Sequence, residues 1–554
     1  MQIPRCQLTS ALNVPRVLTM LMLISALSAE GAEHQPRLGM PQDWTHSHVI
    51  FNRQVLSTHP SLANAEPRVL QQFLRRAQSY FSTSNPLAAG DPQGRPTVEL
   101  KRDWNVALGA GKVSFGMSPI KYGFDANAPP DCTNDYAAFG LNVAGVTGGQ
   151  ANFVGMNDLY SGPGGLCGTG NPSLLFAYNT TTIAGGRIIT SPVVSVDGTK
   201  IAFVESATGA AVFHVLTWAK GPGNGVSPTD SAAPGVGNSA SMTSLTFAPI
   251  TDSRSSPWVD YAADEAYVGA DDGKLYKMTG VFKGTPTLAG PPWPVTVNAN
   301  RRLTAPVLDH ITRNIFIGDA QGFLWSINVD NPALTASLAV GLSGALRAAI
   351  LDGPLVDSGN GTVFAVSSND GASAVVVQAD TSSLAELRRG RIGAGSTTGT
   401  SVSIYDGAFS NNYFNSPGTG GLFLCGTGAA DITPWRYFFG FSGRIMNTNA
   451  SSAQLLQSTN ARCSPITEFF NRNIGGAGTD FFFWSLTTEC TGTGTAGCVI
   501  SRNNFDVVTT ADQPGGTSAI IIDNNSTAGQ ASNIYFTDQA NAGSAVKLTQ
   551  NGLN

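Results

Sequence analysis

The chain has 554 residues, and its 32 Lys or Arg against 37 Asp or Glu give a formal net charge of −5. Charged residues make up only 12 %, whereas glycines number 63. This composition excludes a coiled coil or helical solenoid, and an apolar share of 42 % excludes a disordered chain. No long basic run is present, so we expect no nucleic-acid partner. The abundance of Gly, Thr, Ser and Asn is typical of a mostly β protein.

The first 32 residues predict a signal peptide. Arg5 and Arg16 are positively charged, and they precede or adjoin the uncharged apolar stretch Val17–Ala29. That stretch is long enough for a signal sequence but shorter than the about 20 residues that cross a bilayer as a helix. No later stretch approaches that length, so we expect no transmembrane span. The mature protein is predicted to be secreted, periplasmic or held at the cell surface.

Six cysteines follow the predicted signal peptide, and an even number in an exported chain favours disulfides. Proximity in the sequence favours three pairs among the many combinations: Cys132 with Cys167, Cys425 with Cys463, and Cys490 with Cys498. No CxxC motif or Cys/His cluster is present, so we expect no metal site.

Residues 33–104 form an N-terminal segment whose composition differs from that of the rest of the chain. An amphipathic helix is predicted in it at 66–82. Apolar residues recur there at three- and four-residue spacing, which marks one face of a helix: Val69, Leu70, Phe73, Leu74, Ala77, Tyr80 and Phe81. A single helix with such a stripe needs a partner surface, so we expect it to dock on the main domain or on another protein.

Residues 105–554 contain a repeat. Each unit opens with a small residue and a proline or its equivalent, continues with a short apolar strand, and ends with a strand of alternating polarity. The openings lie at Ser118-Pro119, Ser191-Pro192, Thr243-Ser244, Ala305-Pro306, Gly353-Pro354, Ser416-Pro417, Ser464-Pro465 and Thr517-Ser518.

Eight such units predict an all-β fold, an eight-bladed β-propeller of four-stranded antiparallel blades. Proline is tolerated at the first residue of a strand, and glycines supply the turns. Blades stacked radially bury both of their faces, which one blade alone cannot do. Two stacked β-sandwiches are the alternative, but they would not need a common opening motif eight times.

Two segments resemble the blade repeat of the pyrroloquinoline-quinone-like propellers: VGADDGKLYKMTG at 268–280 and FIGDAQGFLWSINVD at 316–330. The resemblance implies the propeller fold, in a superfamily that includes quinoprotein dehydrogenases and outer-membrane assembly scaffolds. The dehydrogenases carry two adjacent cysteines against the quinone, a repeated tryptophan-docking stretch and a calcium-binding set. None of these is recognisable here, so we expect no cofactor.

Histidines are scarce in the predicted propeller. His214 and His310 lie there without a GxSxG motif, so structural roles are favoured over catalysis. His46 and His48 share one face of a possible strand, where an exposed pair is favoured over a metal site. The aromatic runs 437–439 and 481–484 predict strands that are buried on both faces.

Several of the few arginines stand just ahead of the strand openings: Arg187, Arg301, Arg302, Arg347 and Arg462. The segments that lead into the innermost strands of a propeller meet at one mouth of its channel. Arginines there would form a positive mouth that suits a carboxylate, phosphate or sulfated ligand. The simpler interpretation, which the pairing of buried charges favours, is that each arginine pairs with an Asp or caps loop carbonyls.

The sequence therefore favours a non-enzymatic binding or scaffold protein that engages a protein or an anionic or glycan ligand through a propeller face. One alternative is a propeller enzyme, either a quinone-dependent oxidoreductase or a hydrolase or lyase acting on a polysaccharide. Another is a structural subunit of an extracellular assembly.

Overall fold

A computed structural model describes residues 39–81, 100–123, 130–345, 347–398, 402–471, 478–488, 490, 497–503, 508–524, 532–540 and 542–550. The predicted signal peptide, residues 1–32, lies outside the described residues.

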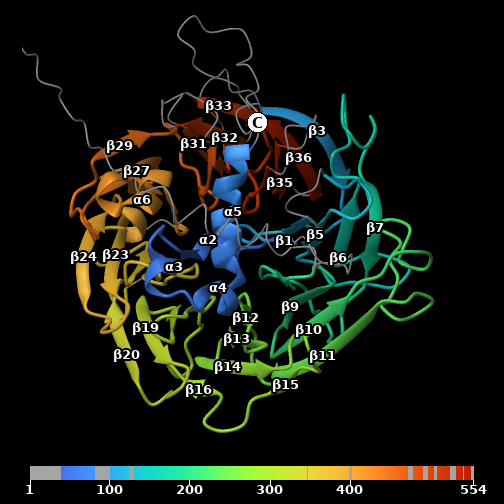
Figure 1. Cartoon of the computed structure of the whole chain (residues 1–554), viewed down its shortest axis with the longest axis horizontal. Helices are drawn as coiled ribbons and strands as arrows, with labels where there is room; N and C mark the ends of the chain where they lie inside the picture. Colours follow the sequence, from blue (N-terminus) through green and yellow to red (C-terminus); the bar gives the residue numbers. More distant parts are fainter. Residues whose placement is uncertain are drawn as a thin grey trace, which may run out of the picture. The chain divides into compact units, whose positions relative to one another are not determined.

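Eight antiparallel sheets are arranged as the blades of a β-propeller (Figure 1). Blade 1 contains β4 (Ile120–Gly123), β5 (Tyr136–Gly140), β6 (Phe153–Asn157) and β7 (Ser173–Tyr178). Blade 2 contains β8 (Val193–Val194), β9 (Lys200–Ala207), β10 (Ala210–Thr217) and β11 (Ser241–Ala248). Blade 3 contains β12 (Trp258–Asp260), β13 (Glu265–Gly269), β14 (Lys274–Thr279), β15 (Thr287–Leu288) and β16 (Val295–Thr296). Blade 4 contains β17 (Val307–Asp309), β18 (Asn314–Gly318), β19 (Phe323–Asn328) and β20 (Thr335–Ala339).

The second half of the chain continues the pattern. Blade 5 contains β21 (Leu355–Asp357), β22 (Thr362–Ser367), β23 (Val375–Asp380) and β24 (Glu386–Arg391). Blade 6 contains β25 (Ala408–Phe409), β26 (Gly421–Thr427), β27 (Pro434–Ser442), β28 (Ile445–Met446) and β29 (Ser452–Leu455). Blade 7 contains β30 (Thr467–Asn471), β31 (Thr479–Leu486), β32 (Cys498–Asn503) and β33 (Val508–Asp512). Blade 8 contains β34 (Ile521–Asn524), β35 (Ser532–Thr537), β36 (Ser544–Gln550) and β3 (Leu100–Ala107).

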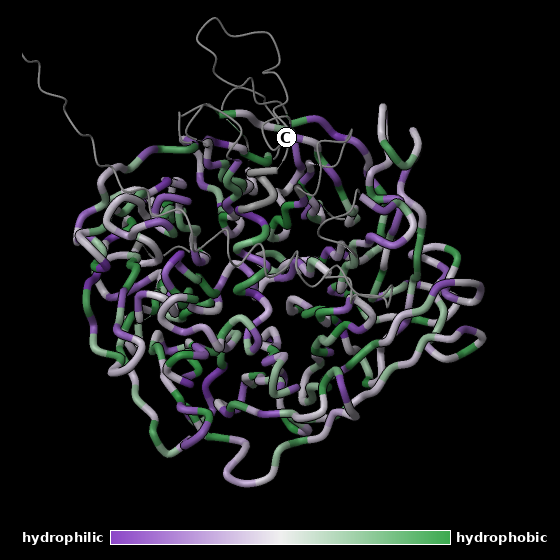
Figure 2. The backbone as a smooth tube through the Cα atoms, in the orientation of Figure 1, coloured by the Kyte–Doolittle hydropathy of each residue, from purple (hydrophilic) through white to green (hydrophobic). Residues whose placement is uncertain are grey.

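The core lies between the faces of neighbouring blades. Middle strands such as β31 are buried along their whole length, as the run 481–484 predicts, whereas the outer strand β20 is largely exposed. In β27, burial alternates instead, so the run 437–439 is only partly buried. Hydrophobic and hydrophilic residues are accordingly interleaved around the ring, with no segregation to one side (Figure 2).

Two predicted blade openings are wrong. Thr243-Ser244 lies inside β11, the outer strand of blade 2, and blade 3 opens at Ser256-Pro257, immediately before β12. Pro417 begins the short 3-10 helix η2 (Pro417–Thr419), and blade 6 opens at Gly407, just before β25. A Ser-Pro step favours the first turn of a helix as well as the first residue of a strand, so the motif alone does not separate them.

The two ends of the chain close the ring together. Strand β3 precedes β4–β36 in the chain, yet it pairs antiparallel with β36 at the outer edge of blade 8. Trp104 of β3 is 2 % exposed, and its Nε1 donates a hydrogen bond to the carbonyl of Leu159 in blade 1 at 3.1 Å. On the inner side, β34 of blade 8 lies beside β4 of blade 1.

Residues 39–81 lie at the centre of the ring, where Figure 1 shows their helices. Its elements are β1 (Met40–Gln42), α2 (Thr45–His48), β2 (Val49–Ile50), α3 (Val55–Thr58), α4 (Leu62–Ala65) and α5 (Pro67–Phe81). Strand β1 extends blade 1 by pairing with β4, and β2 pairs parallel with β21 of blade 5. We call residues 39–81 the plug. One further short helix, α6 (Asn411–Asn415), and the 3-10 helix η1 (Gly395–Thr398) lie in loops.

Truncating the closing tryptophan tests this arrangement. We expect Trp104→Ala to lower the free energy of unfolding by about 3–5 kcal/mol, since it removes a buried aromatic side chain from the seam between blades 8 and 1. Urea unfolding measures the effect. Lys101 lies on the same strand but is exposed, so Lys101→Ala should change stability by less than about 0.5 kcal/mol. Equal effects of the two substitutions would contradict the closing role of Trp104.

Candidate functional site in the central channel

The innermost strands surround a cavity of about 170 Å³ in the centre of the ring. Residues at or just before the start of each inner strand contribute to its wall, one set from every blade. They include Met117, Ser191, Ser256, Ala305, Gly353, Ala408, Ile466 and Ala519. The plug closes the wall with Trp44, His48 and Arg75, among others. The cavity therefore lies between the plug and the ring.

The plug fills the channel mouth at the carboxyl ends of the inner strands. The amide of Ser358, just after β21, donates to the carbonyl of Ile50 at 3.2 Å. The guanidinium of Arg68 donates to the carbonyl of Val259 in β12 at 3.0 Å. Because a strand begins at one end and leaves at the other, the segments that lead into the inner strands lie at the opposite mouth, which we call the open mouth.

A buried arginine anchors the plug. Arg68 is fully buried, forms an ion pair with Glu66 at 2.9 Å, and lies over the ring of Trp258 at 4.2 Å from the ring centroid. It is also 4.6 Å from the centroid of Tyr261. A buried guanidinium is stabilised when its charge is matched and its face stacks on aromatic rings, so this cluster fixes α5 against blade 3.

Glu66 carries two positive partners. His310, just after β17, lies with its Nε2 at 3.1 Å from Oε2 of Glu66, an oxygen that also contacts Arg68. Burial by itself raises the pKa of Glu66, but Arg68 and His310 outweigh it and hold the pKa at about 2. Burial likewise lowers the pKa of His310, and its contact with Glu66 outweighs that effect and raises it. His310 therefore has the structural role that the sequence favours.

Two carboxyl groups that interact electrostatically line the channel wall. Asp352 precedes β21 and Asp406 precedes β25, and both line the cavity. Burial, and then the negative charge of Asp352, raise the pKa of Asp406 well above its ordinary value. Oδ2 of Asp406 is buried without a hydrogen-bond partner among the described residues. Nε2 of His48, from the plug, lies 3.5 Å from Asp352 Oδ1.

A second acidic pair is associated with the plug. Glu468 of β30 forms an ion pair with Arg76 of α5 at 3.2 Å. Asp480 accepts hydrogen bonds from the amide of Asn411, and burial together with the charge of Glu468 raises its pKa well above the ordinary value. This acidic pair has an arginine, Arg76, as an ion-pair partner, which distinguishes it from Asp352 and Asp406.

The five predicted arginines lie in the segments that border the open mouth, but they do not form one cluster. Arg187, Arg301, Arg347 and Arg462 are exposed, and Arg302 is partly buried. Only Arg462 comes close to the carboxyl pair: it lies over the ring of Phe115 at 4.7 Å, and it borders a small cleft together with Tyr405 and Asp406.

Arg254 is a residue of this mouth that the sequence analysis missed. It lines the cavity, two residues before the Ser256-Pro257 opening. Burial and the like charge of Arg254 lower the pKa of Arg302, which places the two guanidinium groups near each other. Recognising the true opening of blade 3 would have added Arg254 to the predicted set.

His46 and His48 are not an exposed pair. Both lie on the short helix α2 and are 6 % and 8 % exposed. His46 contacts Asp43 and Gln71 within the plug, whereas His48 lies near Asp352 of the ring. His214 is fully buried, with its Nε2 2.8 Å from Glu205 Oε2, in agreement with a structural role.

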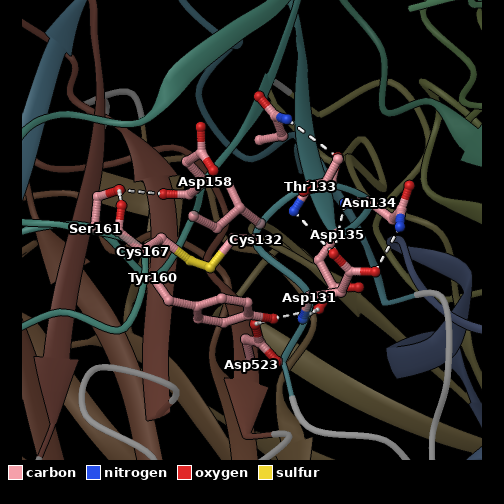
Figure 3. Close-up of a disulfide and its surroundings, with 12 residues drawn as sticks. Asp131, Cys132, Thr133, Asn134, Asp135, Asp158, Tyr160, Ser161, Cys167 and Asp523 are labelled. Carbon is pink, nitrogen blue, oxygen red and sulfur yellow. Dashed lines mark hydrogen bonds between the residues drawn. A yellow bond between two sulfur atoms is a disulfide. The ribbon is translucent and has the colours of Figure 1, made fainter.

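Three disulfides are present, and they are the pairs that sequence proximity favours: Cys132–Cys167, Cys425–Cys463 and Cys490–Cys498. Figure 3 shows the first, beside Tyr160, whose hydroxyl donates to Asp135 at 2.7 Å. In the described part of the chain, metal-like spacing is found only for Cys132, Asp158 and Cys167. The disulfide occupies both sulfur atoms, so this group has no thiolate to offer a metal.

Comparisons with known proteins show the fold alone. No known protein family and no curated protein matches the chain. BamB from Moraxella catarrhalis is 13 % identical, with a TM-score of 0.41, over 73 % of this chain and 95 % of that one. Sqt1 from Saccharomyces cerevisiae is 10 % identical, with a TM-score of 0.50, over 81 % and 99 %. Sqt1 from Chaetomium thermophilum, solved with the N-terminus of ribosomal protein L10, is 10 % identical, with a TM-score of 0.48, over 82 % and 100 %.

The chain is a β-propeller. At such low identity the similarity carries no function across, and membership of the quinone-type superfamily stays a prediction. Among the helices of the described ranges, none has the length and apolarity needed to cross a membrane.

The anchor of the plug makes stability depend on pH. Because the pKa of Glu66 is lowered to about 2, its ionised form adds roughly 3 kcal/mol to the free energy of unfolding above about pH 4.5. That contribution is lost as the pH falls from 4.5 towards 2. The raised pKa of His310 acts oppositely, since its contribution is complete below about pH 6.5 and is lost at higher pH.

We therefore expect Glu66→Gln to destabilise the protein most between about pH 4.5 and 6.5, by roughly 3 kcal/mol, and least near pH 2. Urea unfolding across this range measures the difference. Glu386→Gln is the control, since Glu386 contacts Arg389 on the exposed strand β24. A pH-independent loss in Glu66→Gln would refute the electrostatic anchor.

Proposed function

We propose that this protein is an exported propeller that acts as a binding or scaffold protein at the cell surface or outside the cell. Its ligand is anionic and binds at the open mouth of the channel. The residues that we assign to this site are Arg187, Arg254, Arg301, Arg302, Arg347 and Arg462.

The observation that carries this proposal is the difference between two groups of arginines. Arg68 and Arg76 of the plug, and Arg313, Arg389 and Arg444 of the blades, each lie within 4.0 Å of a carboxylate. Within the described ranges, none of the six arginines at the open mouth has such a partner. Guanidinium groups without carboxylate partners are free to bind an anionic ligand through paired hydrogen bonds.

The position of the plug in the channel also supports a binding site at the open mouth. The plug covers the carboxyl ends of the inner strands, where Arg68 and Arg76 are matched by Glu66 and Glu468. At the other end, a ligand approaching from solvent meets guanidinium groups without a carboxylate within 4.0 Å among the described residues, and Asp271 acts on Arg302 and Arg254 only from a greater distance. Long-range attraction of this kind accelerates association at low ionic strength.

Export is supported by the disulfides together with the predicted signal peptide. Disulfides persist in secreted, periplasmic and surface proteins and are rare in the reducing cytosol. All six cysteines that follow the predicted signal peptide are paired. This compartment suits a protein whose ligands are surface or extracellular molecules.

The test uses dextran sulfate as a polyanionic probe, with neutral dextran beside it. We expect the triple variant Arg254→Ala, Arg302→Ala, Arg462→Ala to bind dextran sulfate at least about 10-fold more weakly, since three charge-assisted contacts are lost. Isothermal titration at low salt measures the affinity, and the thermal midpoint monitors the fold.

A second triple variant with the same charge change controls for net charge. Arg388, Arg391 and Arg444 are exposed and lie away from the channel, on β24 and on the hairpin of blade 6. Replacing all three with Ala should leave dextran sulfate affinity within about 2-fold of the parent protein. If both triple variants weaken binding equally, the open mouth is not the site.

A further inference from the structure

We propose that the channel binds a small zwitterionic molecule, whose ammonium group lies between Asp352 and Asp406 and whose anionic group lies on Arg462. This inference rests on the anionic-ligand function above for its anionic half and adds a cation site inside the channel that the arginine pattern alone does not imply.

The proposed site for the ammonium group rests on Asp406, a carboxyl group without a cationic partner among the described residues. Of the acidic side chains that line the cavity, Asp43 contacts His46 and Glu468 contacts Arg76. Asp352 faces the imidazole of His48. Asp406 is 5 % exposed, and no cation contributes to its electrostatic environment, which is set by burial and by Asp352. A buried carboxyl of this kind keeps its proton when no cation is near, and a bound cation stabilises its ionised form.

Independent features of the wall point to a polar organic ligand. Nε1 of Trp44 and Nε2 of His48 both line the cavity, are buried, and have no hydrogen-bond partner among the described residues. The plug supplies both of these atoms, whereas the blades supply the carboxyls. The cavity of about 170 Å³ is similar to a cavity of ~150 Å³ that holds one benzene molecule, so it accommodates a ligand of a few heavy atoms.

The anionic half rests on the position of Arg462. The cleft that contains Arg462 also contains Tyr405 and Asp406, so Asp406 borders both this cleft and the central cavity. The pKa of Tyr405 is raised to about 12 by burial, then by the charge of Asp352, while Arg462 acts in the opposite direction. Tyr405 is thus influenced by the charges of both Asp352 and Arg462. A ligand that contacts both Asp406 and Arg462 carries opposite charges at its two ends.

The spacing of the donors favours an ammonium group over one metal ion. The donor atoms of Asp352, Asp406 and His48, all in described ranges, are not all within 4.8 Å of one another. A metal ion would draw three ligand atoms to about 2.0–2.6 Å from a single centre. Hydrogen bonds from an ammonium reach about 2.7–2.9 Å and tolerate a wider spacing.

The experiment compares three probes of equal chain length: γ-aminobutyrate, butylamine and butyrate. Isothermal titration at pH 7 uses the secreted chain with its disulfides intact. We expect γ-aminobutyrate to bind at least 10-fold more tightly than either probe with a single charge. Asp406→Asn should lower its affinity to that of butyrate, and Arg462→Ala should lower it to that of butylamine.

Asp271→Asn is the matched control. Asp271 also has a raised pKa, caused by burial, and an oxygen without a hydrogen-bond partner among the described residues, but it does not line the cavity, and the arginines that act on it are Arg302 and Arg254 rather than Arg462. This substitution should leave γ-aminobutyrate affinity unchanged. Thermal midpoints of all variants show whether the fold is retained.

Each other result overturns the inference in a distinct way. If butyrate binds as tightly as γ-aminobutyrate and Arg462→Ala weakens both, the anionic mouth stands and the ammonium site fails. If butylamine binds as tightly and Arg462→Ala has no effect, the carboxyl pair binds amines and the anionic mouth fails with the inference. Binding of Ca²⁺ or Zn²⁺ that depends on Asp406, without binding of γ-aminobutyrate, would assign the site to a metal. No binding of any probe overturns the inference outright.

Discussion

The pairing of β3 with β36 is the constraint on which the rest of the molecule depends. A radial stack of sheets leaves two unpaired edges unless its ends are joined, and here strands from opposite ends of the chain share blade 8. Fully buried charges accompany this seam: Lys547 of β36 lies 3.3 Å from Asp103 of β3, and Lys121 of blade 1 lies 2.9 Å from Asp523 of blade 8. Breaking one partner of such a pair is costly, so the seam tolerates little rearrangement.

The closure of the ring by β3, a strand that comes early in the chain, also determines which segment fills the channel. Strand β3 completes blade 8, and residues 39–81, which precede it in the chain, enter the centre of the ring. The two ends of the channel then differ in charge pairing. Arg68 and Arg76 of the plug pair with carboxylates, whereas the arginines at the open mouth have no carboxylate within 4.0 Å among the described residues. The proposed binding site follows from this asymmetry.

The sequence predicts the start of a blade correctly where a residue type fits only one local structure. It fails where the same residue type fits two. Proline opens blades 1, 2, 4, 5 and 7 as predicted, because the first residue of an inner strand needs no amide hydrogen bond. Pro417 misleads because a 3-10 turn accepts proline equally well. The positions of the arginines along the chain are predictable, since the five predicted ones lie five to eight residues before an inner strand. The grouping of His48, Asp352 and Asp406 is not, because three segments far apart in the sequence meet only after the ring has closed.

The plug is covalently joined to the ring, so it behaves as a tethered ligand of its own channel. A segment that binds within its own chain has an effective concentration far above that of a dilute free molecule. A free molecule that sought the plugged mouth would have to compete with that concentration, whereas a ligand at the open mouth would not compete with the plug.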